Sequence, residues 1–384
     1  MAVLTKNPSR NIPDSNIVLA DFLTGRVPTG HQEDYLLALE TALADFNPVT
    51  VAPFRYPQLH APADVPTIER GNRIGRYLAT FRVSMRYLNA PTPTLLIFHG
   101  PEFRDFIAFA AAALMRRRRG QGRGVFVMRR KAWAIVGRRG LKARLLDAVI
   151  KWMAPSRFFY MLSDSRSVMD YWLGCTGVDG PILSIPTRRP VETVTRKPED
   201  SVVIGLLGGF RLEKGASLYS AVIAMALGES STEVDCQISE NAAESEEIAL
   251  MRSLTNKWQG NPRVRFHCGH LDATAFARLL YSVDIVVLPY DAESYGPGTS
   301  GILFEALAAG RIVAITRIDW AVQEYADHPN ILWLEDRNSD TIKAALKNAT
   351  ERVVTARKTG GLSVPDTDQF KQTWCAALKD AARD

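Results

Sequence analysis

The chain has 384 residues, of which 46% are hydrophobic and 23% charged, and its formal net charge is +6. These values are typical of a soluble globular protein, and the length predicts two domains of ordinary size. No run of eighteen apolar residues occurs and the N-terminal segment has no apolar signal core, so we expect neither a membrane-spanning helix nor secretion. The four cysteines and six histidines show neither a disulfide framework nor metal-ligand spacing, which predicts a reducing, cytoplasmic location and no bound metal.

The first part of the chain predicts strands that alternate with helices. Apolar runs are expected to form strands of an open α/β sheet at residues 17–22, 49–51, 94–98 and 158–162. The first strand leads into a glycine-containing loop that carries Gly30 and His31, and a helix follows. Because ligands of such sheets bind outside the carboxyl ends of the strands, we expect this loop to face a cleft.

A histidine directly follows the strand predicted at residues 94–98. His99 is therefore expected at the mouth of the same cleft. Its imidazole could act on a bound substrate or could only fix its own loop, and the sequence leaves both roles open.

Basic residues are concentrated between residues 116 and 157. This basic block holds fourteen Lys or Arg and a single acid, Asp147, so the rest of the chain is acidic overall. Residues 138–153 place a set of apolar side chains at helical spacing, namely Leu141, Leu145, Val149, Trp152 and Met153. A basic amphipathic helix fits an anionic membrane surface, but a helix packed on the core with a solvated basic face would show the same pattern. No stacking platform or recognition helix is evident, so we expect no nucleic-acid partner.

A change in composition predicts the end of the first domain. Residues 182–186 are expected to form its last strand. Residues 187–201 combine proline and charge with no apolar period, which is typical of a linker. We therefore predict one domain at residues 1–186, a second at residues 202–362, and a C-terminal helix within residues 363–384.

The second domain opens with a strand and a glycine-rich turn, VVIGLLGGFRLEKGASL at residues 202–218. The apolar run is long enough for a buried parallel strand, and Gly208 and Gly209 allow a ligand to approach the backbone closely. Arg211 and Lys214 follow; Arg grips a phosphate through two parallel N–H groups, and Lys acts as a point charge. Alone, this pattern fits a phosphate site and an ordinary strand-to-helix turn with solvated cations about equally well.

A second strand, loop and helix follow at residues 284–316, DIVVLPYDAESYGPGTSGILFEALAAGRIVAIT. The helix is expected to begin at Thr299, Ser300 and Gly301, whose free N–H groups and helix dipole form an anion site. Glu305 lies one turn further on, where a carboxylate can accept bonds from ribose hydroxyls. The helix is apolar nearly all round, so an unpaired carboxylate would be costly there, which favours a binding role for Glu305 over a solvated one.

These segments resemble the donor domain of retaining glycosyltransferases with the GT-B fold, and the closest pattern is that of glycosyltransferase family 4. The matching pieces are GGFRLEKG, VDIVVLPY and FEALAAG. The resemblance covers residues 202–362, and over the first domain it concerns the architecture alone. It implies an α/β protein of two Rossmann-like domains that face each other across a cleft, with a C-terminal helix that crosses back to the first domain.

The resemblance also implies roles for individual residues. Arg211 and Lys214 would stabilise the leaving diphosphate and His99 would lie near the reacting sugar, so these are the expected catalytic residues. The loop with Gly30 and His31 would lie on the acceptor side. The donor would be bound by Gly208, Gly209, His270, Leu271, Tyr295, Thr299, Ser300, Gly301 and Glu305.

One position departs from the family pattern. Family 4 enzymes commonly have a glutamate eight positions before the ribose-binding glutamate, and this chain has Pro297 there. In the family that glutamate contacts the donor sugar. Glu293, Tyr295 or backbone N–H groups would have to replace it, so the sequence does not identify the sugar.

We therefore predict a hexosyltransferase that needs neither a metal nor a cofactor. It would move a hexose from a nucleotide diphosphate sugar to a glycan or lipid-linked acceptor, with retention, in bacterial surface or exopolysaccharide synthesis. The basic block would let this cytoplasmic enzyme dock on the inner face of the membrane. One alternative is a nucleotide-sugar epimerase of the same fold, for which His99, Glu102 and Asp105 are the acid or base candidates. Another is a non-enzymatic protein that binds membrane surfaces through its basic residues.

Overall fold

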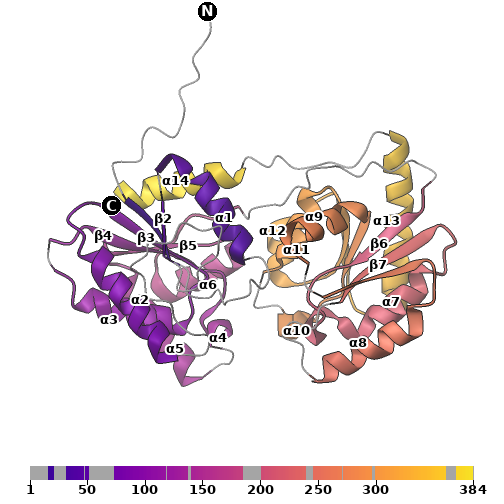
Figure 1. Cartoon of the computed structure of the whole chain (residues 1–384), viewed down its shortest axis with the longest axis horizontal. Helices are drawn as coiled ribbons and strands as arrows, with labels where there is room; N and C mark the ends of the chain where they lie inside the picture. Colours follow the sequence, from indigo (N-terminus) through magenta and orange to yellow (C-terminus); the bar gives the residue numbers. More distant parts are fainter. Residues whose placement is uncertain are drawn as a thin grey trace, which may run out of the picture. The chain divides into compact units, whose positions relative to one another are not determined.

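The chain folds as two compact units, each built on a parallel sheet with helices on both faces (Figure 1). The first unit comprises Met1–Pro186 and Asp368–Asp384, and the second comprises Thr187–Thr367. The computed structural model describes residues 16–20, 32–46, 48–51, 73–117, 119–136, 140–184, 200–238, 245–269, 271–295, 299–359 and 369–383.

The first unit has a five-stranded sheet in the order β2-β1-β3-β4-β5. Successive side chains of a strand point to opposite faces, so each strand contributes to two apolar cores. One core lies under α2, α3, α5 and α6, and the other lies under α1 and α14. The elements are β1 (Asn16–Ala20), α1 (Gln32–Ala42), a 3-10 turn (Ala44–Phe46), β2 (Val49–Val51), α2 (Arg73–Leu88), β3 (Thr94–His99), α3 (Phe103–Leu114), β4 (Gly122–Val127), α4 (Ala132–Ile135), α5 (Leu141–Met153), β5 (Phe159–Leu162), α6 (Arg166–Thr176) and α14 (Gln369–Arg383).

The last helix, α14, is part of the first unit's core although it follows the second unit in sequence. Trp374 and Leu378 are buried against the sheet face that carries Leu19 and Ile97. The buried Arg123 guanidinium in β4 donates to the carbonyl of Ala381 at the end of α14. These contacts join the C-terminal helix to strands that lie more than two hundred residues earlier in the chain.

The second unit has a six-stranded parallel sheet in the order β11-β10-β9-β6-β7-β8. Helices α7, α8 and α13 cover one face of it, and α9, α11 and α12 cover the other. The elements are β6 (Val202–Leu206), 3-10 turns (Leu212–Lys214, Ala216–Leu218), α7 (Tyr219–Ala226), β7 (Thr232–Ile238), α8 (Ser245–Trp258), β8 (Val264–Cys268), α9 (Ala273–Ser282), β9 (Ile285–Leu288), α10 (Ala292–Tyr295), α11 (Gly301–Ala308), β10 (Ile312–Thr316), α12 (Asp319–Tyr325), β11 (Ile331–Leu334) and α13 (Ser339–Thr359).

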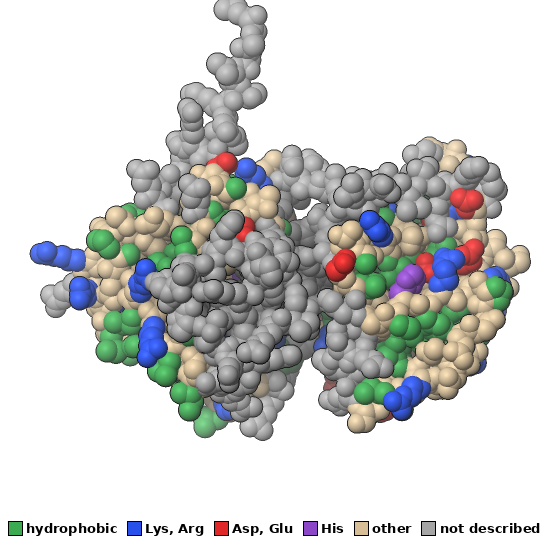
Figure 2. Space-filling model, viewed as in Figure 1, with side chains coloured by type: hydrophobic (Ala, Val, Ile, Leu, Met, Phe, Trp, Pro, Cys, Tyr) green, Lys and Arg blue, Asp and Glu red, His purple; other side chains and the backbone are tan. Residues whose placement is uncertain are grey.

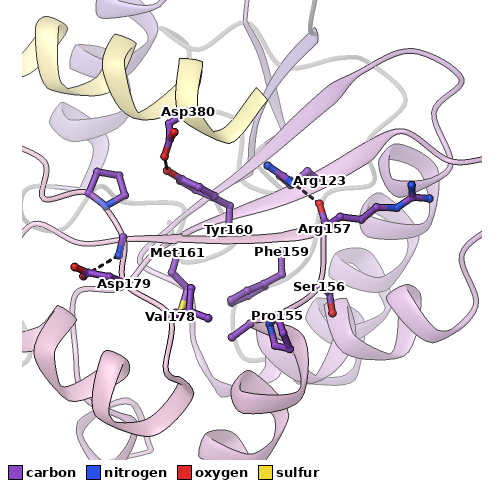
Figure 3. Close-up of a pocket in the computed structure, with 13 residues that line it drawn as sticks. Arg123, Pro155, Ser156, Arg157, Phe159, Tyr160, Met161, Val178, Asp179 and Asp380 are labelled. Carbon is purple, nitrogen blue, oxygen red and sulfur yellow. Dashed lines mark hydrogen bonds between the residues drawn. The ribbon is translucent and has the colours of Figure 1, made fainter. Parts of the chain in front are cut away.

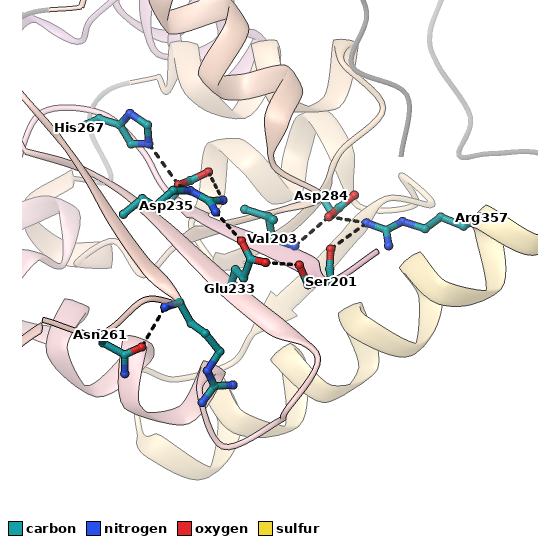
Figure 4. Close-up of polar contacts among 10 residues, drawn as sticks. Ser201, Val203, Glu233, Asp235, Asn261, His267, Asp284 and Arg357 are labelled. Carbon is teal, nitrogen blue, oxygen red and sulfur yellow. Dashed lines mark hydrogen bonds and ion pairs between the residues drawn. The ribbon is translucent and has the colours of Figure 1, made fainter. Parts of the chain in front are cut away.

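A buried aspartate fastens the middle of the second sheet (Figure 4). The Asp284 carboxylate, just before β9, accepts one bond from the Val203 N–H in β6 and one from the Arg357 guanidinium in α13, each 2.8 Å long. Charge-assisted bonds of this kind are stronger than bonds between neutral groups. The aspartate of the VDIVVLPY segment therefore has a structural role, in which it holds two strands and a helix together.

A second buried carboxylate links β7 to β8 on the same sheet (Figure 4). Asp235 receives the Arg265 guanidinium at 2.7 Å and the His267 Nε2 at 3.1 Å. Although burial alone would raise the pKa of Asp235, the hydrogen bonds from His267 and Arg265 lower it below its ordinary value. This edge of the sheet is therefore held by side-chain charges as well as by the backbone.

The fold corrects the sequence prediction at two strands. Residues 122–127, inside the basic block, form β4, a buried strand between β3 and β5. The strand was not predicted because its glycines and Arg123 interrupt the apolar pattern. In the structure Gly124 packs closely on Phe109, since a Cβ at position 124 would lie 2.4 Å from the Phe109 ring. The strand expected at residues 182–186 is not formed in its described part, residues 182–184, where the structure has only an isolated bridge between Ser163 and Ile182.

Helix α5 packs on the core mainly through residues other than the apolar side chains singled out by their spacing. Its buried side chains are Ala143, Leu146, Ile150 and Met153. Of the apolar side chains singled out by their spacing, Met153 is fully buried, whereas Leu141, Leu145 and Trp152 are exposed. The predicted apolar stripe therefore points mainly to the surface of the first unit.

Candidate functional site

The strand order of the second sheet brings the two sequence motifs together. In chain order its strands run 3-2-1-4-5-6, so the direction of winding reverses between β6 and β9. Open α/β sheets bind ligands at the carboxyl ends of the strands at such a switch point. The glycine-rich turn follows β6 and the loop to α11 follows β9, so both motifs lie at this point.

Two contacts show how closely the two loops approach each other. The Asp291 N–H after β9 donates to the Glu213 carbonyl at 2.9 Å. Gly215, which has a φ of +82°, leaves room for the Pro289 carbonyl oxygen, which would lie 2.2 Å from a Cβ at that position. A side chain at Gly215 would push the two loops apart, so the glycine is required by a close approach as well as by its φ angle.

Gly208 brings the turn against the first residues of α11. Its φ is +105°, and a Cβ there would lie 2.2 Å from Ile302 Cδ1. Its N–H donates to Gln237 Oε1 at the carboxyl end of β7, at 2.7 Å. Gly209 is in a more open place, since the nearest atom to a Cβ there would be the Arg211 Nε at 4.0 Å. The glycine pair therefore lets the backbone pass between α11 and the two cations.

The two predicted cations lie on one turn. Arg211 precedes the 3-10 turn that ends in Lys214; its side chain is 42% exposed and pairs with Glu213 at 3.0 Å. Lys214 Nζ lies 6.0 Å from the centre of the Tyr295 ring. Burial, and then the neighbouring Arg211 charge, lower the pKa of Lys214 to about 8. Because like charges repel and solvent is partly excluded, an anion at this turn would be favoured.

The N-terminus of α11 faces the same loop. Ser300 caps the helix, because its Oγ accepts from the Leu303 N–H at 3.2 Å, and it also bonds the Tyr290 hydroxyl at 2.9 Å. Tyr295 lies against Tyr290, with ring centres 4.1 Å apart, and its hydroxyl donates to the Thr299 carbonyl at 3.3 Å. The two tyrosines thus fix the conformation of the loop that leads into the helix. Because the Ser300 side chain is used by the helix cap, the backbone N–H groups are the anion-binding part of the predicted site.

Glu305 lies one turn into α11 and is only 4% exposed. Its neighbours Ile302, Leu303 and Ala306 belong to the apolar core on this face of the sheet. A carboxylate shielded from bulk water in this way makes strong hydrogen bonds with hydroxyl groups that reach it. Its position agrees with the predicted ribose contact, which stays a prediction.

Sequence reasoning missed several residues that support this site. Gln237 holds the Gly208 N–H, and Glu247 Oε1 in α8 accepts from the Leu212 N–H at 2.8 Å. Asp291 pairs with Arg337 at 2.6 Å and so fixes the start of the loop after β9. A polar residue at the end of an apolar strand is a signal that could have pointed to Gln237. Asp291 stands in the second motif itself, but its partner Arg337 is distant in sequence, and nothing local marks Glu247 in α8.

Other predicted site residues lie at the margins of the described structure. Gly30, His31, His270 and Pro297 fall outside the described residues. Leu271 is half-buried and packs against the core under α9 and α11. Among the residues that the structure describes, no group of three or more His, Cys, Asp or Glu side chains could hold a metal ion.

His99 lies in the first unit, at the carboxyl end of β3. In that sheet the winding reverses between β1 and β3, so His99 also follows a switch-point strand. Its ring stacks on Tyr35 with centres 3.9 Å apart. Burial, and then the Arg129 charge, hold the pKa of His99 well below its ordinary value, so the imidazole is neutral at physiological pH.

A cavity in the first unit does not share these features (Figure 3). It has a volume of about 580 Å³ and lies beside the edge strand β5, with Pro155, Ser156 and Arg157 from the loop that precedes this strand. Its polar groups bond to one another, as Tyr160 does to Asp380 in α14. The cavity reaches the amino end of β5, away from the carboxyl edge where such sheets bind ligands, so we do not assign it as the candidate site.

The chain matches no family model, and no curated protein matches its sequence. Its structure is nevertheless similar to solved structures over nearly the whole chain. Anabaena HepE in complex with UDP-glucose has a TM-score of 0.65 at 13% identity and covers 95% of this chain and 95% of its own. Sucrose-phosphate synthase from Thermosynechococcus elongatus has a TM-score of 0.60 at 12% identity, with 96% of this chain and 94% of its own covered.

The chain has the GT-B fold. A protein named as a UDP-N-acetylglucosamine 2-epimerase from Listeria monocytogenes is similar as well, with a TM-score of 0.62 at 13% identity and coverage of 96% and 97%. Likeness at such identities concerns the fold, because one fold carries several activities. The GT-B prediction is thus confirmed, whereas membership of family 4 and retention stay predictions.

Proposed function

We propose that this GT-B protein is a glycosyltransferase that moves a hexose from a nucleotide diphosphate sugar to a glycan or lipid-linked acceptor. One observation carries the proposal, namely that Arg211, Lys214 and the N-terminus of α11 meet at the switch point of the second sheet. A diphosphate needs cations and backbone N–H groups, and a ribose needs an acceptor such as Glu305. The solved structures with this fold support it, since HepE is seen with UDP-glucose.

The chemistry follows from charge that develops on the leaving group. The bond between the anomeric carbon and the diphosphate oxygen breaks, an acceptor hydroxyl oxygen forms the new bond to that carbon, and the hydroxyl proton leaves with the diphosphate. Arg211, Lys214 and the α11 N–H groups would stabilise the negative charge on the departing diphosphate. Donors that are already in place cost no reorganisation during the reaction, and this is usually the largest catalytic contribution. Retention is inferred from the resemblance to family 4.

We further propose that the reaction needs no metal, because the cations and the helix N-terminus supply the positive charge that a metal would bring. Activity should then survive EDTA. Complete loss of turnover in EDTA that is restored by magnesium or manganese would contradict this part of the proposal. The control is the same assay with EDTA already saturated with magnesium.

The epimerase alternative is supported by one neighbour of the same fold. It would require acid and base groups free to move protons. Two of the three candidates are instead held in a structural triad, because the Arg76 guanidinium pairs with Glu102 at 2.8 Å and with Asp105 at 2.6 Å. Asp105 is buried, and it also accepts from the Thr80 hydroxyl. This engagement favours transfer over epimerisation.

We also propose that the first unit docks on an anionic membrane surface. Large apolar side chains are exposed on α2, α3 and α5, where Ile74 is 74%, Leu114 is 73% and Leu141 is 84% exposed. Figure 2 shows hydrophobic and basic side chains side by side over the lower left part of this unit, where Figure 1 labels α3 and α5. Exposed apolar groups flanked by cations are typical of a surface that inserts between anionic headgroups. Within the described residues, no helix is long and apolar enough to cross a bilayer.

Not every cation of the basic block serves this surface. The Arg123 guanidinium is buried against backbone carbonyls, and Arg129 pairs with Asp164 at 2.6 Å. The exposed cations include Arg117, Arg119 and Lys142. An enzyme docked on the membrane could reach acceptors carried on lipids. The proposed role is therefore in the synthesis of bacterial surface polysaccharides or exopolysaccharides, which the resemblance to family 4 also suggests.

A panel of nucleotide diphosphate sugars tests the proposal directly. The full chain should show a raised melting temperature with one nucleotide and its sugar conjugates, since a ligand at a hundred times its dissociation constant stabilises by about 2.7 kcal/mol. With that donor and a matching acceptor, it should release the nucleoside diphosphate and form a glycoside. Interconversion of the donor sugar without any glycoside product would favour the epimerase instead.

A further inference from the structure

A polar cluster lies at the carboxyl edge of the first sheet, apart from the donor motifs. In the register of the sheet His99 pairs with Val127, and Val127 pairs with Leu162. The residues that follow β4 and β5 therefore come to the same edge as His99. We name the carboxyl-edge cluster by its members Tyr35, His99, Arg129, Asp164 and Ser165.

Direct contacts join the members of the cluster. Arg129 Nε donates to Asp164 Oδ2 at 2.6 Å, and the Arg129 guanidinium carbon lies 5.5 Å from the centre of the Tyr35 ring. Tyr35 in turn stacks on His99. Ser165 follows Asp164 in the chain and stands at the N-cap of α6. Four separate elements, α1, β3, the β4 loop and the β5 loop, thus place their polar groups in one location.

Three polar atoms of the cluster have no hydrogen-bond partner among the residues that the structure describes. They are His99 Nε2, Asp164 Oδ1 and Ser165 Oγ. Their residues are 4%, 3% and 0% exposed, so bulk water does not supply the missing bonds. Ser165 does not even use its hydroxyl as a helix cap, although serine at an N-cap normally does so. An unsatisfied buried polar group costs about 1–3 kcal/mol, so three together indicate a place for a polar ligand.

The charges of the cluster decide which ligand fits. Arg129 and the N-terminus of α6 both favour an anion, and the Asp164 carboxylate already fills that role. A phosphate would therefore meet a carboxylate rather than an open cationic site. The groups that remain are a carboxylate oxygen that only accepts, a neutral imidazole nitrogen and a hydroxyl. This set matches the hydroxyl groups of an uncharged sugar.

We propose that Asp164 Oδ1 and Ser165 Oγ, beside His99, bind hydroxyl groups of a neutral saccharide on the first unit. The proposal rests on the transferase function and deepens it, because it makes the bound part of the acceptor a sugar rather than a lipid or a phosphate. Asp164 accepts from one sugar hydroxyl while Arg129 holds its other oxygen in place. Ser165 donates to or accepts from a second hydroxyl.

Saturation-transfer NMR on the full chain tests this subsite. The probes are the methyl glycosides of D-glucose, D-galactose, D-mannose and N-acetyl-D-glucosamine, each in the presence of UDP. At least one glycoside should receive saturation from the wild-type protein. Ser165→Ala should weaken its binding by about threefold or more and Asp164→Asn by about tenfold or more, since a bond to a charged group contributes more. Asp170→Asn, an exposed aspartate on the same helix, is the matched control and should bind as the wild type does.

The outcomes separate this inference from the proposed function. Absence of any glycoside signal in the wild type, or equal binding by Ser165→Ala and the control, overturns the subsite. If Asp164→Asn melts before it can be measured, Ser165→Ala decides alone, because it removes one oxygen and leaves the Arg129–Asp164 pair intact. The shift of melting temperature with UDP, recorded for all four proteins, reports on the second unit. If no nucleoside diphosphate of the panel raises the melting temperature of the wild type, while the wild type binds a glycoside that the two site variants no longer bind, the transferase proposal is refuted and the subsite stands.

Discussion

The carboxyl edges of the two sheets carry different polar groups on the same parallel architecture. In the second unit the polar groups stand on the loops after β6 and β9, partly exposed and cationic, with backbone N–H groups beside them. In the first unit they are buried, and Asp164 already balances the charge of Arg129. An exposed cationic edge suits a diphosphate that brings its own charge. A buried and balanced edge suits hydroxyl groups, which must replace water without adding charge.

The largest effect that tests this contrast concerns the two cations of the second unit. Arg211→Ala and Lys214→Ala should each lower turnover by on the order of a hundredfold or more, as expected when one preorganised charge contact to the leaving group is removed. Steady-state kinetics with the identified donor would measure it. Lys347→Ala, which removes an exposed cation from α13, is the control. Near-normal turnover in both site variants would mean that Arg211 and Lys214 do not stabilise the leaving diphosphate.

A second test asks whether contact with lipid belongs to the first unit. Arg117→Gln combined with Arg119→Gln should weaken binding to vesicles that contain anionic lipid by roughly thirtyfold, because each basic residue near the surface contributes about 1 kcal/mol. Binding should also weaken with salt and be small for neutral vesicles. Co-sedimentation would measure it. The matched pair Lys343→Gln and Lys347→Gln removes the same charge from the second unit and should bind normally. Equal, negligible sedimentation with both kinds of vesicle would mean that the basic face is only solvated.

Glu305 should have an effect of intermediate size. Glu305→Gln should raise the dissociation constant of the nucleoside diphosphate by on the order of tenfold, because a hydrogen bond to a charged group contributes about 1.5–3 kcal/mol. Calorimetric titration would measure it, with Glu351→Gln on the exposed side of α13 as the control. The 2′-deoxy nucleotide should then lose little further affinity in the variant. If it still loses the full wild-type amount, the ribose partner is another group.

The smallest effect is a pH dependence that the second unit should have because of Lys214. Its pKa of about 8 in the free protein means that the ammonium loses its proton as pH rises through this value. A bound diphosphate favours the charged form, so affinity should be constant below about pH 8 and should fall above it by at most tenfold per pH unit. Lys214→Arg stays charged, so this decline should disappear. Titrations with UDP between pH 7 and pH 9 would measure both proteins, and identical profiles would exclude Lys214 as the titrating group.

The turn after β6 and the start of α11 could be predicted from sequence because their determinants are local, whereas the donor-binding role of both stays a prediction. A strand, two glycines, two cations and a helix cap within a few residues specify a turn and its chemistry together. The same local reasoning failed at β4, whose glycines and Arg123 resemble a solvated charge run. Only the packing of Gly124 on Phe109, and the carbonyls that receive Arg123, make that segment a central strand.

The sequence by itself determined the α/β class and the two motifs after β6 and β9, because apolar periodicity and turn chemistry act over short distances along the chain. The GT-B expectation came from the resemblance of these motifs to a known family. Tertiary structure alone decided that both motifs share one switch point, since strand order depends on pairings between distant segments. Only the tertiary structure places Val203 and Arg357 beside the Asp284 carboxylate, which joins them. It also gathered Tyr35, His99, Arg129 and Asp164 at one edge. The partners of a buried polar group come from whichever elements pack beside it, and the order of residues in the chain does not record them.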